Sequence, residues 1–205
     1  MKFKTSQEEF WAGSFGDEYI DRNMNEKLLA ANTALFSKII SRTSNIQTII
    51  EFGPNIGLNL ISLNQLLPKA ELYGVEINAK AVAILKKWGK AKIYHQSVLD
   101  YVVDFPRDLV LTKGLLIHLD PKMLPLVYSK IYEASQKYIC IAEYYSPKSQ
   151  EINYRGNTQK LFKRDFAGEL LESFSDLTLV DYGFIYHRDP NFPLDDISWF
   201  LLKKK

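Results

Sequence analysis

Apolar residues along the chain follow two spacings, one typical of buried strands and one typical of amphipathic helices. Short runs rich in β-branched and aromatic residues predict strands at residues 46–52, 70–77, 91–96, 108–113, 137–144, 177–187 and 196–204. Helical spacing lies between several of these runs, at residues 57–67, 79–87 and 121–135. Strands that alternate with helices indicate βαβ units and a mostly parallel sheet that is covered on both faces.

The two ends of the chain depart from this alternation. Helical patterns at residues 7–23 and 26–42 precede the first predicted strand, and a helix at 163–174 precedes the last two strands. Only the loop 188–195 joins those last two strands. They must be antiparallel, because a parallel connection needs about a dozen residues or more.

These patterns predict an α/β protein with a Rossmann-like, doubly wound, seven-stranded mixed sheet. We expect five parallel strands plus a C-terminal antiparallel hairpin, with helices on both faces and N-terminal helices over the site. No repeat or low-complexity segment divides the chain, so we expect a single domain over residues 1–205. Within it, residues 1–45 would form a helical cap or lid, and residues 46–205 would form the core.

Composition and charge exclude several classes of protein. The chain is 46% hydrophobic and 24% charged, as in ordinary globular domains. Its formal net charge is only +2, which the terminal lysines 203–205 alone exceed, so we expect no nucleic-acid partner. A single cysteine, Cys140, lies in an apolar run and indicates a core position in a reducing compartment. No apolar run approaches the ~18 residues of a membrane span and no signal peptide is recognisable, so we expect a cytoplasmic protein without a membrane partner.

The segment 51–57, which reads EFGPNIG, carries the clearest chemical signal. Its glycine spacing is not the G-x-G-x-x-G that binds a pyrophosphate, and the acid Glu51 before the first glycine would repel one. Glu76 ends the next predicted strand, where a carboxylate usually accepts the hydroxyl protons of a ribose. The pair predicts a positively charged nucleoside, which points to S-adenosylmethionine. The alternative is that both acids are solvated strand ends.

With these motifs the chain resembles the class I S-adenosylmethionine-dependent methyltransferases over essentially its whole length. Their first motif, (D/E)-x-G-x-G-x-G, matches here except that Asn55 replaces the middle glycine. Asparagine tolerates a positive φ, so we expect Asn55 in a glycine-like conformation. The resemblance implies S-adenosylmethionine as cofactor and no metal. The cofactor-binding residues that it implies, together with two residues of the expected lid, are Tyr19, Arg22, Glu51, Gly53, Asn55, Gly57, Glu76, Ile77, Ser97, Val98, Thr112 and Lys113.

A narrower similarity is to the methylases associated with pseudaminic acid biosynthesis. The segments that carry it are 8–23, 51–60, 73–78, 111–121, 144–156 and 197–204. This similarity implies methyl transfer to a hydroxyl or amine of a small, sugar-like metabolite of a nucleotide-sugar or nonulosonic acid pathway.

Candidates for the acceptor side follow the later strands. His118 is the candidate general base, and the alternative, which its position favours, is a histidine that caps or packs under the site. Residues 143–166 form a long segment of weak periodicity, which in a compact domain indicates either a functional loop or a solvated one. The candidate substrate-binding residues are Tyr144, Tyr145, Asn153, Arg155 and His187. Trp11, Phe15 and Tyr19 share a helix face and predict either a lid or ordinary packing.

The alternatives are methyl transfer to nucleic acid or to another small molecule, cofactor binding without catalysis, and hydride transfer by a nicotinamide dehydrogenase. A nucleic-acid methyltransferase is disfavoured because the segment after the fourth predicted strand reads TKGL instead of (D/N)-P-P-(Y/F). A non-catalytic S-adenosylmethionine-binding partner protein is allowed by Asn55 but not favoured by it. A nicotinamide dehydrogenase is disfavoured by the glycine spacing. The acceptor and the oligomeric state stay open.

Overall fold

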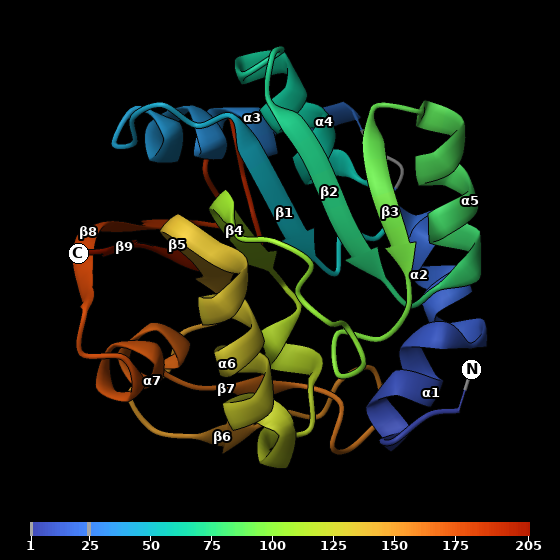
Figure 1. The fold of residues 1–205 in the computed structure, drawn as a ribbon. Coiled ribbons are helices and arrows are strands. Elements are labelled where there is room, and N and C mark those ends of the chain that lie inside the picture. The colour runs from blue at the N-terminus through green and yellow to red at the C-terminus, as the bar shows by residue number, and fades with distance from the viewer. Residues whose placement is uncertain (1, 24–25) are drawn as a thin grey trace.

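The computed structural model of the chain describes residues 2–23 and 26–205. Within this part of the chain, seven strands form one sheet in the order β3-β2-β1-β4-β5-β9-β8 (Figure 1). The strands are β1 (Thr48–Phe52), β2 (Glu71–Glu76), β3 (Ala91–His95), β4 (Arg107–Lys113), β5 (Ser135–Glu143), β8 (Leu177–Ile185) and β9 (Ile197–Lys204). The helices are α1 (Ser6–Ala12), α2 (Ser14–Asn23), α3 (Glu26–Ile40), α4 (Leu58–Leu66), α5 (Ala79–Trp88), α6 (Leu124–Ala134) and α7 (Phe166–Ser173), with 3-10 turns η1 (Leu116–His118) and η2 (Pro121–Met123).

The strand pairing confirms the predicted fold class. Parallel pairing joins β1 to β2 and β4, β2 to β3, and β4 to β5. β9 pairs antiparallel with both β5 and β8, which makes the C-terminal hairpin. The order of connections reverses between β1 and β4, because β2 and β3 lie on one side and β5 on the other. Ligands of open α/β sheets bind outside the carboxyl ends of the strands at such a point.

Alternate residues of the buried strands face two separate cores. On β1, Ile49 packs into the cluster that contains residues of α3 and α4, and Ile50 into the cluster that contains residues of α6 and α7. Strands buried on both faces read as continuous apolar runs, which is why the sequence pattern located them well. Among the described residues, no helix is both long and apolar enough to cross a membrane.

The expected N-terminal helix at 7–23 is wrong in one respect, because it is two helices. A capping box between Thr5 and Glu8 begins α1. Gly13 then ends it with an extended backbone, φ −96° and ψ −159°, and α2 starts at Ser14. The break turns the chain, and the three rings of Trp11, Phe15 and Tyr19 nevertheless stay in contact: those of Phe15 and Tyr19 each lie edge-on to Trp11, at 5.5 Å and 5.2 Å.

Two expected boundaries near the C-terminus also differ. The helix expected at 163–174 does not start at residue 163, because that residue belongs to strand β7 (Phe162–Lys163). This strand pairs with β6 (Gln150–Glu151) in a small hairpin. Helix α7 starts only after Asp165, whose carboxylate accepts the Gly168 N–H. The expected strand 177–187 ends at Ile185. Strands of two residues have no periodicity that a sequence pattern could reveal.

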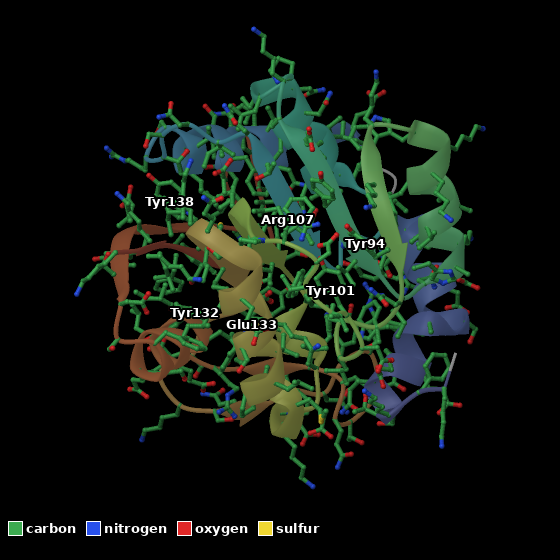
Figure 2. The ribbon with its side chains drawn as sticks, in the orientation of Figure 1. Tyr94, Tyr101, Arg107, Tyr132, Glu133 and Tyr138 are labelled. Atoms are coloured by element: carbon green, nitrogen blue, oxygen red, sulfur yellow. The ribbon has the colours of Figure 1, made fainter. Side chains whose placement is uncertain are left out.

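A buried arginine fixes the segment between β3 and β4. The guanidinium of Arg107 donates to the hydroxyls of Tyr94 and Tyr101, each at 3.0 Å, and these three side chains lie together in Figure 2. It also pairs with Asp104 at 2.5 Å. Burial opposes the charge on Asp104, but hydrogen bonds from Arg107 and the tyrosines hold the pKa of that carboxyl well below its usual range. The network holds the segment 97–106 in place, and this segment begins at one wall of the site.

Replacing Gly57 with alanine should lower the free energy of unfolding by about 1–3 kcal/mol. Gly57 has φ 87°, and a Cβ there would lie 2.3 Å from Leu85 Cδ2. Chemical denaturation measures the loss. The matched control is Gly156→Ala, since Gly156 has φ 83° and nothing within 4 Å of the added Cβ. Equal losses in both variants would show that the contact with Leu85 costs nothing.

Candidate functional site

A cavity opens where the carboxyl ends of β1, β2 and β4 meet the N-terminal helices. Its open volume, including its mouth, is about 780 Å³. Its lining residues are Gln7, Glu8, Trp11, Tyr19, Gly53, Asn55, Val75, Glu76, Ile77, Asn78, Ser97, Val98, Lys113, Gly114, Leu115, His118 and Leu119. A smaller cavity of about 430 Å³ lies on the other side of the loop 53–57, towards α3 and α4.

The loop between β1 and α4 has an unusual backbone. Gly53, Asn55 and Gly57 have φ angles of 73°, 51° and 87°. The glycine-like conformation expected of Asn55 is therefore confirmed. Its side-chain oxygen accepts the N–H of Ile56 at 2.7 Å, a local bond that helps asparagine occupy this region. The alternation lets the backbone N–H of Asn55 point towards β2.

Glu76 receives that N–H. Its Oε2 accepts from the Asn55 N–H and its Oε1 from the Asn78 N–H, both at 2.8 Å. The carboxyl is buried among these groups at the edge of the cavity. Burial raises the pKa of Glu76, and the backbone N–H bonds act in the opposite direction. Glu76 thus ties the ends of β1 and β2 together while facing the cavity.

Glu51 lies beneath the loop and is fully buried. Its Oε1 accepts from Asn59 Nδ2 at 2.6 Å, whereas its Oε2 has no partner among the described residues. Burial raises the pKa of Glu51 to about 8, against the effects of Asn59 and of the charge on Lys113. Two further buried acceptors, the amide oxygens of Asn32 and Asn59, also lack a donor within the described part of the chain. Asn32 and Asn59 line the smaller cavity, so a donor-rich group is what this corner lacks.

The opposite wall comes from the end of β2, the residues just after it and the segment that follows β3. Ile77, Ser97 and Val98 line the cavity there, and the Ser97 hydroxyl accepts the N–H of Leu99 at 3.0 Å. After β4, Lys113 lines both cavities, while Thr112 is buried below and lines neither.

The N-terminal helices roof the cavity. Trp11 contacts the ring of His118 at 4.5 Å, and the Gln7 side chain donates to the Gln159 carbonyl at 2.9 Å. Tyr19 lines both cavities, and burial raises its pKa to about 12. Arg22 lies outside the lining of either cavity, paired with Glu18 at 3.5 Å. The roof is thus pinned to the loop after β6 from the opposite end of the chain.

His118 lines the cavity beneath this roof. Its Nδ1 lies 2.7 Å from the Lys160 carbonyl oxygen, which can only accept, so Nδ1 carries the proton. Burial lowers the pKa of His118 to about 4, although the bond to Lys160 acts in the other direction. The imidazole is therefore neutral at physiological pH, and its Nε2 is a hydrogen-bond acceptor.

The five residues expected to bind the acceptor do not lie together, and none of them lines the main cavity. Tyr144 packs under Lys163 Nζ, which lies 5.2 Å from its ring centre. Asn153 closes a turn by accepting the Gly156 N–H, and His187 pairs with Asp196 on the surface at 2.9 Å. Tyr145 contacts Phe200 at 5.9 Å, and Arg155 sits exposed in the same turn as Asn153.

Glu143 lines neither cavity but supports a segment of the site, and the sequence pattern did not single it out. At the end of β5, its Oε1 accepts the N–H groups of Leu115 and Leu116, both at 3.1 Å. Burial raises the pKa of Glu143 to about 7 against these bonds. It shapes the segment that carries His118. The available signal was an acid at the end of a predicted strand, as for Glu51 and Glu76.

No family model matches the chain, and no curated protein matches it in sequence. Among solved structures, 1,6-didemethyltoxoflavin N1-methyltransferase of Burkholderia thailandensis with bound S-adenosylhomocysteine superposes with a TM-score of 0.70, at 14% identity, over 97% of this chain and 87% of that one. Magnesium protoporphyrin IX methyltransferase of Synechocystis PCC 6803 with bound S-adenosylhomocysteine superposes with a TM-score of 0.69, at 11% identity, over 97% of each chain. A plantazolicin methyltransferase in complex with S-adenosylhomocysteine superposes with a TM-score of 0.67, at 15% identity, over 98% of this chain and 94% of that one. The chain therefore has the Rossmann-like fold of the S-adenosylmethionine-dependent methyltransferases.

Proposed function

We propose that the protein is an S-adenosylmethionine-dependent methyltransferase that acts on a hydroxyl or amine of a small, sugar-like metabolite. The observation that carries the proposal is the pair of buried carboxylates, Glu51 and Glu76, on either side of a loop with three positive φ angles. A pyrophosphate would meet two acids here. A ligand with an ammonium group and a ribose meets acceptors for both.

The unpaired atoms of the site fit that cofactor. The α-ammonium of S-adenosylmethionine has three donors, and three buried acceptors without a donor lie at this corner: Glu51 Oε2 and the amide oxygens of Asn32 and Asn59. Glu76 keeps lone pairs for the ribose hydroxyls beside its two backbone bonds. Ile77, Val98 and Leu119 offer apolar surface for the adenine ring. When bound, the cofactor supplies an electrophilic methyl group on a positively charged sulfur.

The chain itself supplies alignment and a dry cavity. Methyl transfer is an in-line displacement, so positioning of the two reactants provides most of the acceleration. With both ligands in place, the roof of Trp11 and Tyr19 would separate the reacting groups from water. His118, the candidate catalytic histidine, offers a neutral Nε2 that can accept a hydrogen bond from the acceptor and orient it. A histidine with a pKa near 4 is better suited to accept a hydrogen bond than to hold a proton taken from the acceptor.

The sugar-like acceptor rests on the similarity to the methylases associated with pseudaminic acid biosynthesis. The methyltransferases of similar fold act on substrates as different as 1,6-didemethyltoxoflavin and magnesium protoporphyrin IX, so the fold does not identify the acceptor. Tyr144, Asn153 and Arg155 lie within the long segment after β5, and their side chains suit a polar acceptor with a carboxylate or phosphate. His187 and Tyr145 would contact the acceptor only at the rim.

Titration calorimetry with S-adenosylmethionine, S-adenosylhomocysteine and NAD tests the cofactor. We expect both S-adenosyl ligands to bind and NAD not to bind, and the reverse pattern would refute the proposal. A screen with labelled S-adenosylmethionine against nucleotide sugars and nonulosonic acids tests the acceptor. Transfer to an oligonucleotide but to none of the sugars would support the nucleic-acid alternative instead.

A further inference from the structure

Lys113 occupies a central place that binding of the cofactor does not explain. It ends β4, where its Cα is in register with Ala142 of β5. The residues that line both cavities are Tyr19, Gly53, Asn55 and Lys113. Lys113 is therefore the amine shared by the two cavities within the described part of the chain, next to the carboxyl end of β5, where the segment with Tyr144 begins.

The amine of Lys113 has no hydrogen bond or ion pair to residues 2–23 or 26–205. Acids face it from three elements: Glu51 from β1, Glu143 from β5 and Asp195 from the loop between β8 and β9. Burial lowers the pKa of Lys113 more than these acids raise it. Glu143 is already occupied by backbone N–H groups, and Glu51 holds its own proton up to about pH 8. No carboxylate therefore holds the amine as a salt bridge would.

We propose that Lys113 is the proton acceptor of the methyl transfer, taking the proton of the acceptor hydroxyl or amine. This inference rests on the proposed function. The acceptor oxygen or nitrogen forms a bond to the methyl carbon, the carbon–sulfur bond breaks with its electron pair on sulfur, and the acceptor proton passes to Lys113 Nζ. Solvent then removes that proton from the ammonium between turnovers.

Charge complementarity supports this sequence of states. A cationic sulfonium in the same cavity disfavours an ammonium on Lys113 and so favours the neutral amine that a base requires. Transfer leaves the sulfur uncharged, and the new ammonium then faces Glu51 and Asp195. His118 is a weak base, because its pKa lies near 4.

Proton release on ligand binding tests the assignment without a known acceptor. Calorimetry in buffers of different ionisation enthalpy counts the protons released by S-adenosylmethionine and by S-adenosylhomocysteine between pH 6.5 and 9.5. Both ligands carry the α-ammonium that faces Glu51, so their difference isolates the sulfonium charge. We expect the native protein to release up to about one more proton with S-adenosylmethionine. In Lys113→Met this difference should vanish when both ligands are present at saturating concentrations.

Lys113→Arg is the second variant, because arginine keeps the charge and does not deprotonate. It should also abolish the difference in proton release. With the sugar that the acceptor screen identifies, both variants should lower kcat about 10²- to 10⁴-fold and remove the rising limb of its pH profile.

The outcomes separate this proposal from the proposed function. If the native protein binds neither S-adenosyl ligand, both fail. If both ligands bind with equal proton release, or if the difference persists in Lys113→Met, the role of Lys113 is refuted alone. A loss of S-adenosylhomocysteine affinity beyond tenfold in Lys113→Met would make Lys113 a cofactor-binding residue instead of a base.

Discussion

The Glu76→Gln variant should bind S-adenosylhomocysteine about 100-fold more weakly than the native protein, a loss of about 3 kcal/mol. A carboxylate can accept at both oxygens, and here each already receives a backbone N–H, from Asn55 and Asn78. Glutamine presents an NH₂ group at one of these positions, where it faces an N–H donor. The variant thereby loses a ribose acceptor and the bond that shapes the loop. Titration calorimetry measures the affinity.

The matched control is Glu71→Gln, at the other end of the same strand. Glu71 is exposed and accepts from the Tyr73 hydroxyl at 2.6 Å, far from the carboxyl end of β2. Its substitution should leave the affinity within about twofold. An unchanged affinity in Glu76→Gln would mean that the ribose is not held at the end of β2.

The acids at the strand ends could be predicted because their positions follow from topology alone. Glu51 and Glu76 end consecutive parallel strands, and such strands bring their carboxyl ends to one edge of the sheet. Asn55 was also predictable, since few residues other than glycine tolerate its φ of 51°. The φ preference of asparagine is a local rule, and the placement of strand ends is a rule of sheet topology. Both apply here to residues that are close together in the sequence.

The roof of the cavity could not be predicted in the same way. Gln7 and Trp11 line the cavity because α1 meets the loop at residues 159–160, more than 140 positions away. No spacing in the sequence records that contact. The strand boundary near His187 was also not predicted: β8 ends two residues before His187, whose side chain pairs with Asp196 at the surface. Strand ends at a sheet edge are weakly specified, because one face is not buried.

The Glu51→Gln variant should be more stable than the native protein, by an amount that depends on pH. In the unfolded chain Glu51 ionises near 4.5, whereas in the folded protein burial raises its pKa to about 8. Between these values the folded state binds more protons than the unfolded state, so the free energy of unfolding falls as pH rises. Glutamine removes this cost, which reaches about 4–5 kcal/mol above pH 8 and is absent below pH 4.5.

Denaturation of both proteins between pH 5 and 9 measures the difference. The amide of the new glutamine can still pair with Asn59, whose own oxygen lacks a donor in the described part of the chain. Glu71→Gln serves again as the control and should follow the native profile, because Glu71 is exposed. A stabilisation of Glu51→Gln that is equal at every pH would show that ionisation is not its cause.

The stability lost by burying Glu51 has a functional counterpart in ligand binding. Below pH 8 the native site holds a proton that the ammonium of the ligand must displace, because the ammonium pairs only with the ionised carboxylate. The affinity for S-adenosylhomocysteine should therefore rise with pH, approaching tenfold per unit between pH 6 and 8. Glu51→Gln should bind more weakly and lose this pH dependence. A native affinity that is flat across this range would place the ammonium elsewhere and leave the unpaired oxygens of Glu51, Asn32 and Asn59 without the donor that explains their burial.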